Sequence, residues 1–172
     1  VLIPVFGVGR SQEVMLVLEE YFRRNKLLAK NVYLAGIIKE VCAIHTAYPD
    51  YFKENLKRRV LQNNSPFSSP IFKEIENKQN LEDVSNETCN VFLATSGMLV
   101  GGMSVDLLHK FASNEKNTLI FVGWQSEGSI GRRLQEGLKE ITMLDEKGKL
   151  KKIPVNMDVV TIEGFSGHSD KN

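Results

Sequence analysis

The sharpest signal for chemistry is a short segment near the end of the sequence, Gly164-Phe165-Ser166-Gly167-His168-Ser169-Asp170. A histidine between glycine and hydroxyl residues, directly after an apolar run, can reach a ligand. It titrates near neutrality, which suits it to general acid catalysis. Asp170 lies close enough in the sequence to orient the imidazole ring. These features make His168 and Asp170 the candidate catalytic residues. The alternative is a lone histidine in a packing role, because no partner nucleophile is evident.

The segment Gly7-Val8-Gly9-Arg10 has the features of a phosphate-binding turn. Backbone N–H groups at a helix N-terminus favour phosphate, and the Arg10 guanidinium would add a two-pronged contact. The segment lacks the third glycine of a dinucleotide fingerprint and the Gly-Lys-Ser/Thr ending of a P-loop. On spacing alone, a tight turn with a surface arginine is the favoured interpretation.

A second glycine-rich turn, Thr95-Ser96-Gly97-Met98 followed by Gly101-Gly102, comes after a strongly apolar run. Its glycines permit positive φ and close approach of the backbone to a ligand. The hydroxyls of Thr95 and Ser96 could hold an oxyanion or a sugar. An ordinary strand-to-helix turn explains the same residues equally well.

A third turn, Gly123–Gly131, contains Trp124, the only tryptophan of the chain. An exposed tryptophan can stack on a nucleobase, but a tryptophan that packs under its own loop is the interpretation we favour. Arg132 and Arg133 follow in the first turn of a predicted helix, where the helix dipole disfavours cations. Their position favours an anionic partner.

Alternating strands and helices must position these turns. Apolar runs predict strands at Leu2–Phe6, Asn31–Ala35, Asn90–Thr95 and Thr118–Gly123. Helical spacing predicts helices from a Ser11 cap to about Asn25 and over Ile37–Tyr48, Tyr51–Gln62, Ser104–Ser113 and Arg132–Lys139, with Ile71–Glu76 as a short helix. Period-two patterns predict antiparallel strands at Glu140–Leu144, Lys151–Met157 and Val159–Gly164.

This order predicts an α/β fold with a Rossmann-like, mostly parallel sheet, helices on both faces and an antiparallel C-terminal extension. Such sheets bind ligands at the carboxyl ends of their strands. Because every glycine-rich turn follows a predicted strand, we expect the turns to meet at that edge.

The composition limits the classes of protein to which the chain can belong. The 172 residues carry a formal net charge of +1 and are 42% hydrophobic, which suits one soluble domain without a basic excess. Two cysteines form no disulfide framework, and three scattered histidines cannot build a two-metal site. We expect a cytoplasmic protein with no membrane span. The apolar start without Met and the ending after a turn lead us to expect a piece of a longer protein.

Four segments in this order resemble the β-CASP domain of RNA-processing nucleases of the metallo-β-lactamase superfamily. They are Ile3–Glu13, Ala94–Leu99 with Gly101-Gly102, Gly123–Leu134 and Gly164–Asp170. The match covers essentially the whole chain. Ile44–Pro49 and Asn64–Phe72 look closest to the archaeal homologue of the cleavage and polyadenylation specificity factor (CPSF) nuclease subunit, and ribonuclease J is a more distant fit.

The resemblance implies that residues 1–172 are a β-CASP domain inserted into a metallo-β-lactamase domain of the same polypeptide. That second domain would supply an HxHxDH motif and two zinc ions, and the β-CASP domain would form a lid over RNA. Zinc-activated hydroxide would hydrolyse the phosphodiester. This chain contains no HxHxDH motif, so we expect no metal ligand and no activity in the fragment itself.

By this resemblance the parent protein would be a zinc-dependent endoribonuclease that acts in RNA 3′-end processing. Two further expectations are 5′→3′ exonuclease activity and a homodimer that forms through regions outside this chain. His168 matches the family histidine that acts on the scissile phosphate. The alternatives are a non-catalytic RNA-binding scaffold paralogue, a DNA-repair or ribonuclease J-type nuclease, and a small nucleotide-binding domain. The residues that would grip the RNA are Arg10, Ser96, Gly97, Met98, Arg132, Ser166 and Gly167.

Overall fold

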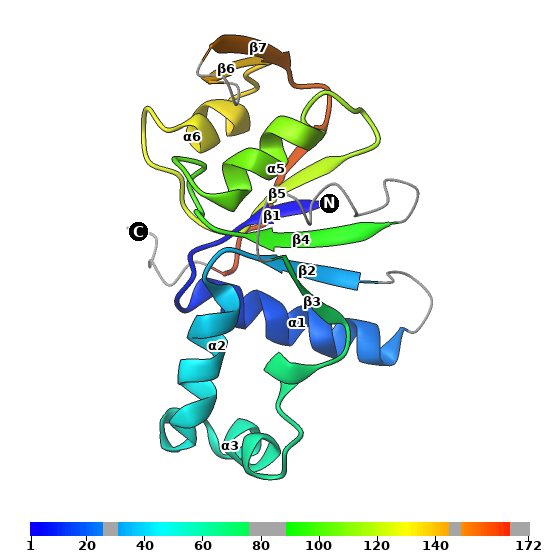
Figure 1. Cartoon of the computed structure of the whole chain (residues 1–172), viewed down its shortest axis with the longest axis vertical. Helices are drawn as coiled ribbons and strands as arrows, with labels where there is room; N and C mark the ends of the chain where they lie inside the picture. The colour runs from blue at the N-terminus through cyan, green and yellow to red at the C-terminus, as the bar shows by residue number, and fades with distance from the viewer. Residues whose placement is uncertain (26–30, 76–88, 145–148, 166–172) are drawn as a thin grey trace.

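A parallel sheet forms the centre of the molecule (Figure 1). The computed structural model describes residues 1–25, 31–75, 89–144 and 149–165. Among these residues six strands pair in parallel, in the spatial order β3 (Phe72–Ile75), β2 (Asn31–Ala35), β4 (Asn90–Ala94), β1 (Leu2–Pro4), β5 (Thr118–Phe121) and β8 (Asp158–Thr161). The predicted α/β class with a mostly parallel sheet is confirmed.

Helices cover both faces of this sheet. One face carries α1 (Arg10–Arg24) and α2 (Ile38–Ala47), with η1 (Pro49–Tyr51), α3 (Glu54–Leu61) and η2 (Pro66–Ser68) beyond them; the other carries α5 (Met103–Phe111) and α6 (Ile130–Gln135) (Figure 1). Within the described residues, no helix combines the length and the apolar character needed to cross a bilayer.

The period-two geometry of β4 joins the two hydrophobic cores. Val91 and Leu93 pack with α1 and α2, whereas Phe92 and Ala94 pack with α5. All five residues of β4 are buried, and the four after Asn90 form a continuous apolar run in the sequence, as expected for a central parallel strand.

The N-cap of helix α1 lies two residues before the predicted Ser11 cap. Gly9 is the N-cap, with φ of 80°, and its N–H donates to Gln12 Oε1 at 2.7 Å. Ser11 lies inside the helix, where its hydroxyl donates to the Gly7 carbonyl at 2.8 Å. The cap prediction was wrong because a glycine with positive φ and a glutamine side chain start the helix instead.

The segment predicted as a short helix at Ile71–Glu76 is the edge strand β3. It pairs in parallel with β2, and Leu34 lies opposite Glu74. Four residues show no helical period, whereas the exposed edge of β2 offers hydrogen-bonding partners to an extended segment.

The C-terminal extension is antiparallel only in part. Strands β6 (Glu140–Leu144) and β7 (Leu150–Pro154) form the predicted antiparallel pair, and Ile141 and Ile153 pack beside α5 and α6. Strand β8, predicted to continue this hairpin, instead joins the main sheet in parallel with β5. Buried Met157 brings the chain back to the core just before β8, so the main sheet and not the hairpin receives the strand.

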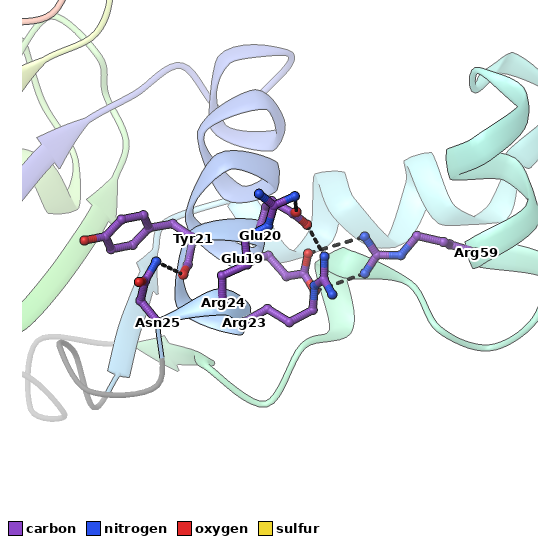
Figure 2. Close-up of polar contacts among 7 residues, drawn as sticks. All are labelled: Glu19, Glu20, Tyr21, Arg23, Arg24, Asn25 and Arg59. Atoms are coloured by element: carbon purple, nitrogen blue, oxygen red, sulfur yellow. Dashed lines mark hydrogen bonds and ion pairs between the residues drawn. The ribbon is translucent and has the colours of Figure 1, made fainter.

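An ionic contact fastens α3 to α1 (Figure 2). Glu19 has 7% of its side chain exposed, and its two carboxylate oxygens accept hydrogen bonds from Arg59 at 3.3 and 3.0 Å. Arg23 lies 3.9 Å from the same carboxylate. The contact therefore holds the helical segment between β2 and β3 against α1.

Candidate nucleic-acid interface

The three glycine-rich turns meet at one edge of the sheet. They follow β1, β4 and β5, which are neighbours and parallel, so their carboxyl ends coincide. The contact between the first two turns is at backbone distance: a Cβ on Gly97 would lie 3.0 Å from both Phe6 N and Val5 C. The predicted convergence of the turns is confirmed.

A cleft opens where these turns part. The β1 turn leads into α1 on one face, whereas the β4 and β5 turns lead into α5 and α6 on the other. Such a switch point leaves a crevice outside the strand ends, where α/β proteins bind ligands. Here the crevice contains a cavity of about 410 Å³ lined by Phe6, Val8, Gly9, Arg10, Glu13, Met98, Gly123 and Trp124.

Arg10 lies in the wall of this cavity. Its side chain is 18% exposed and forms an ion pair with Glu13, one turn along α1. Its guanidinium carbon also lies 5.8 Å from the centre of the Phe165 ring, within cation–π range. Arg10 therefore links the start of α1 to the segment after β8, at the point where residues 166–172 follow.

The second turn uses its own polar groups to hold its shape. The Ser96 hydroxyl donates to the Gly101 carbonyl at 3.1 Å and accepts from the Val100 N–H at 3.2 Å. Ser104 donates to the Ser96 carbonyl at 2.7 Å, and the Thr95–Ser96 peptide is cis. The predicted contact of Ser96 with RNA would thus compete with two bonds within the turn.

Gln125 joins the second and third turns, a role that the sequence did not reveal. Its Nε2 donates to the Gly97 carbonyl at 3.0 Å and to the Gly123 carbonyl at 3.4 Å, and the residue is 3% exposed. Nearby, the Ser126 hydroxyl donates to Met98 Sδ at 3.2 Å. Gly97 and Met98, both predicted RNA contacts, are therefore also attachment points between the turns.

Trp124 is exposed, so the interpretation that it packs under its loop was wrong. Of its surface, 59% is accessible. Gln125, the next residue, turns inward and occupies the buried side of the loop, which leaves the indole outside. Trp124 borders the first cavity and also a second of about 840 Å³, lined by Val122, Gly123, Trp124, Gln125, Arg132, Gln135, Thr161, Ile162, Glu163 and Gly164.

Arg132 lines the second cavity and is the third residue of α6. Because this helix has only six residues and ends at Gln135, Arg132 and Arg133 belong to its last turn, and the predicted conflict of these cations with the helix dipole was wrong. Its side chain is 45% exposed, and its Nε donates to Glu136 Oε1 at 2.8 Å. Ser129 caps α6 by accepting the Arg132 N–H at 3.1 Å. The structure thus brings Arg10, Met98 and Arg132 to one edge of the sheet, on two adjoining cavities.

The remaining candidates, Ser166, Gly167, His168 and Asp170, lie outside the described residues. Within the described ranges, no three His, Cys, Asp or Glu side chains come together as a metal site. The described residues therefore do not fit a zinc centre, and we derive no step through zinc from them.

Comparison with known proteins agrees with this geometry. The family model described as "Beta-Casp domain" matches residues 11–134. The chain is 52% identical over 174 residues to "Transcription termination factor FttA" of Methanocaldococcus jannaschii, 47% over 174 residues to that of Thermococcus kodakarensis, and 42% over 173 residues to that of Lokiarchaeum sp..

These alignments cover 99%, 99% and 100% of this chain but only 27%, 26% and 27% of the relatives. The chain therefore spans about a quarter of the length of the curated relatives that it matches. The resemblance to archaeal β-CASP proteins is confirmed: the chain belongs to the β-CASP domain family.

Proposed function

We propose that this chain is the substrate-binding lid of a zinc-dependent ribonuclease, and that its cleft holds single-stranded RNA beside the catalytic centre. The observation that carries this proposal is the convergence of three turns on adjoining cavities lined by Arg10, Arg132 and an exposed tryptophan. Cations beside an aromatic ring fit nucleic acid, since phosphate and base each find a partner.

The near-neutral charge of the chain is compatible with this role. With a net charge of +1, the chain as a whole attracts phosphate only weakly, and we propose that binding depends on a few placed groups. The relatives are named transcription termination factors, which supports RNA as the substrate class. We propose that the parent protein cleaves transcripts in that process.

In this proposal the zinc ligands belong to the part of the parent polypeptide outside this chain. His168 would donate a proton to the leaving oxygen, and Asp170 would orient the histidine ring. Arg10 and Arg132 would hold phosphates on either side of the reacting bond.

The test compares matched variants of the parent protein. We expect Arg132→Ala to raise KM for a single-stranded RNA substrate about tenfold, because one charged phosphate contact is lost. Arg133→Ala removes the same charge from the next residue, which lines neither cavity, and should leave KM within about twofold. His168→Ala should lower kcat at unchanged zinc content.

Several outcomes would contradict the proposal. Equal effects of the two arginine variants would remove the cleft from RNA binding. A parent protein that binds RNA but never cleaves it would be a scaffold and not a nuclease. Preference for DNA over RNA of the same sequence would indicate a repair enzyme. Zinc or cleavage in the 172-residue chain alone would contradict the proposed division of labour.

A further inference from the structure

We propose that Trp124 is a stacking platform for one nucleobase of single-stranded RNA, and that the neighbouring nucleotides occupy the cavities on its two sides. This inference rests on the proposed function and specifies where the RNA strand lies. It follows from the exposure of Trp124, from the shared wall between the cavities, and from the polar groups that flank the indole.

The exposure of Trp124 is the first observation. An indole is among the largest apolar side chains, and a loop tryptophan usually buries it. Here 59% of the residue is accessible although hydrophobic cores lie on both faces of the sheet. The local cause is Gln125, whose amide holds the inner position by its bonds to Gly97 and Gly123. The same contacts that build the loop therefore keep the indole outside.

The second observation is that Trp124 and Gly123 border both cavities. Trp124 therefore lies on the common border of one space of about 410 Å³ and another of about 840 Å³. Outside residues 122–124, a Cβ on Gly123 would meet no described atom within 4 Å. Together with the 59% exposure of Trp124, this leaves room for a flat base to approach the indole.

The third observation is the polarity of the two spaces. The first contains Arg10 with its partner Glu13, so its net charge is close to zero. The second contains Arg132, whose Nε donates to Glu136 and whose terminal amino groups remain for a ligand, together with Gln135 and Glu163. Gln135 donates to the Thr161 hydroxyl at 3.0 Å, so it is held at the rim. The second space can thus meet a phosphate through Arg132 and a base amino group or ribose hydroxyl through Glu163.

These features favour a nucleobase over an aliphatic ligand. Every base presents a π-face, so stacking on Trp124 is independent of sequence. Duplex RNA keeps its bases stacked on one another and offers no free face to an indole. We therefore expect single-stranded RNA of mixed sequence to bind and a duplex of the same sequence to bind far more weakly.

The chain offers a direct readout, because Trp124 is its only tryptophan. We expect the tryptophan emission of the 172-residue chain to be quenched by iodide, as befits an exposed indole. Short single-stranded RNA should quench the emission further in a saturable way and protect it from iodide. A duplex added at the same nucleotide concentration serves as the control.

Variants then test the role of the ring. Trp124→Ala should weaken binding of single-stranded RNA about 5- to 150-fold, the range measured for loss of one base–aromatic stack. Trp124→Phe keeps a stacking face and should remain within about threefold of the original. Tyr51→Ala removes another exposed aromatic ring, 89% accessible and in η1 beyond α2, and should leave affinity unchanged.

Gly123→Val provides a complementary test. Outside residues 122–124, its Cβ would meet no described atom within 4 Å, so the added side chain would enter the space that Gly123 and Trp124 border. We expect the domain to keep its melting temperature within about 2 °C while RNA affinity falls at least tenfold. Retained affinity with retained folding would overturn the inference.

The failure of this inference can be told apart from that of the proposed function. If RNA binds and Arg132→Ala weakens binding while Trp124→Ala and the emission do not respond, the strand passes elsewhere and only the inference falls. If neither the chain nor its parent binds RNA, the proposed function falls as well. If iodide cannot reach Trp124 in the parent protein, the rest of that polypeptide covers the ring and the inference is overturned.

Discussion

Replacing Gly131 by alanine should destabilise the domain through one side chain, Gln125. A Cβ at position 131 would lie 1.8 Å from Gln125 Oε1 and 2.8 Å from Gln125 Cδ. Gln125 is 3% exposed and is bound to the carbonyls of Gly97 and Gly123, so it cannot move aside without breaking those bonds. The two residues therefore compete for the same space.

The magnitude follows from the two ways to relieve the overlap. A backbone shift that keeps Gln125 in place costs about 1–3 kcal/mol, as for other overpacked sites. Rotation of Gln125 leaves buried carbonyls without a donor and costs about 1–3 kcal/mol. Alanine in place of glycine within α6 returns about 1 kcal/mol. The net loss is at most about 2 kcal/mol, or up to roughly 8 °C in melting temperature for a domain of this size.

A double-mutant cycle makes this reasoning decisive. In a Gln125→Ala background the overlap is gone, and only the 3.3 Å approach to Phe121 Cε1 remains. Gly131→Ala should then be neutral or stabilise by up to about 1 kcal/mol. The assay is urea unfolding of the four proteins. An equal loss in both backgrounds would refute the proposed contact between Gly131 and Gln125.

Three further predictions concern the same domain. Arg59→Ala leaves the Glu19 carboxylate largely unpaired and should lower the unfolding free energy by about 1–2 kcal/mol, whereas Arg58→Ala, at an exposed neighbour, should stay within about 0.5 kcal/mol; urea unfolding of both variants checks this. Burial raises the pKa of the Cys42 thiol above its ordinary value of 9.0, against the smaller opposing effect of a hydrogen bond from Gln12. The folded state therefore holds this proton more tightly than the unfolded state does. The contribution of the thiol to the free energy of unfolding is fully present below about pH 9 and should be lost as the pH rises further. Cys42→Ala should remove this pH dependence, which urea unfolding at several pH values measures, and an identical pH slope in the variant would contradict the reasoning. In the native chain iodoacetamide should modify exposed Cys89 and spare Cys42, and mass spectrometry of the peptides distinguishes the two thiols.

The sequence predicted best what depends on continuous local patterns. Strand Asn31–Ala35 was predicted with the bounds that the structure has, and Asn90–Thr95 to within one residue, because each contains a continuous run of apolar and aromatic residues after its first asparagine. The meeting of the turns was predictable as well, since parallel strands place their carboxyl ends at one edge.

Features that depend on distant partners were missed. Phe72–Ile75 is a strand because β2 has a free edge, and Asp158–Thr161 is parallel because it pairs with β5; neither partner is adjacent in the sequence. Whether Trp124 is buried or exposed depends on which residue of its loop occupies the inner position. Gln125 takes it through carbonyls on two turns, one of them 28 residues away, and no local pattern carries that information.

The Glu19–Arg59 contact also bears on how the domain opens to solvent. Helix α2 is anchored by buried residues that include Ile38 and Cys42. Helix α3 has one buried residue, Val60, and the ion pair between Arg59 and Glu19. Amide protons of α3 should therefore exchange through a local opening of lower free energy than the opening that exposes β4. Because Arg59→Ala removes the contact between Glu19 and Arg59, this variant should accelerate exchange in α3 while amides of the central strands keep their rates.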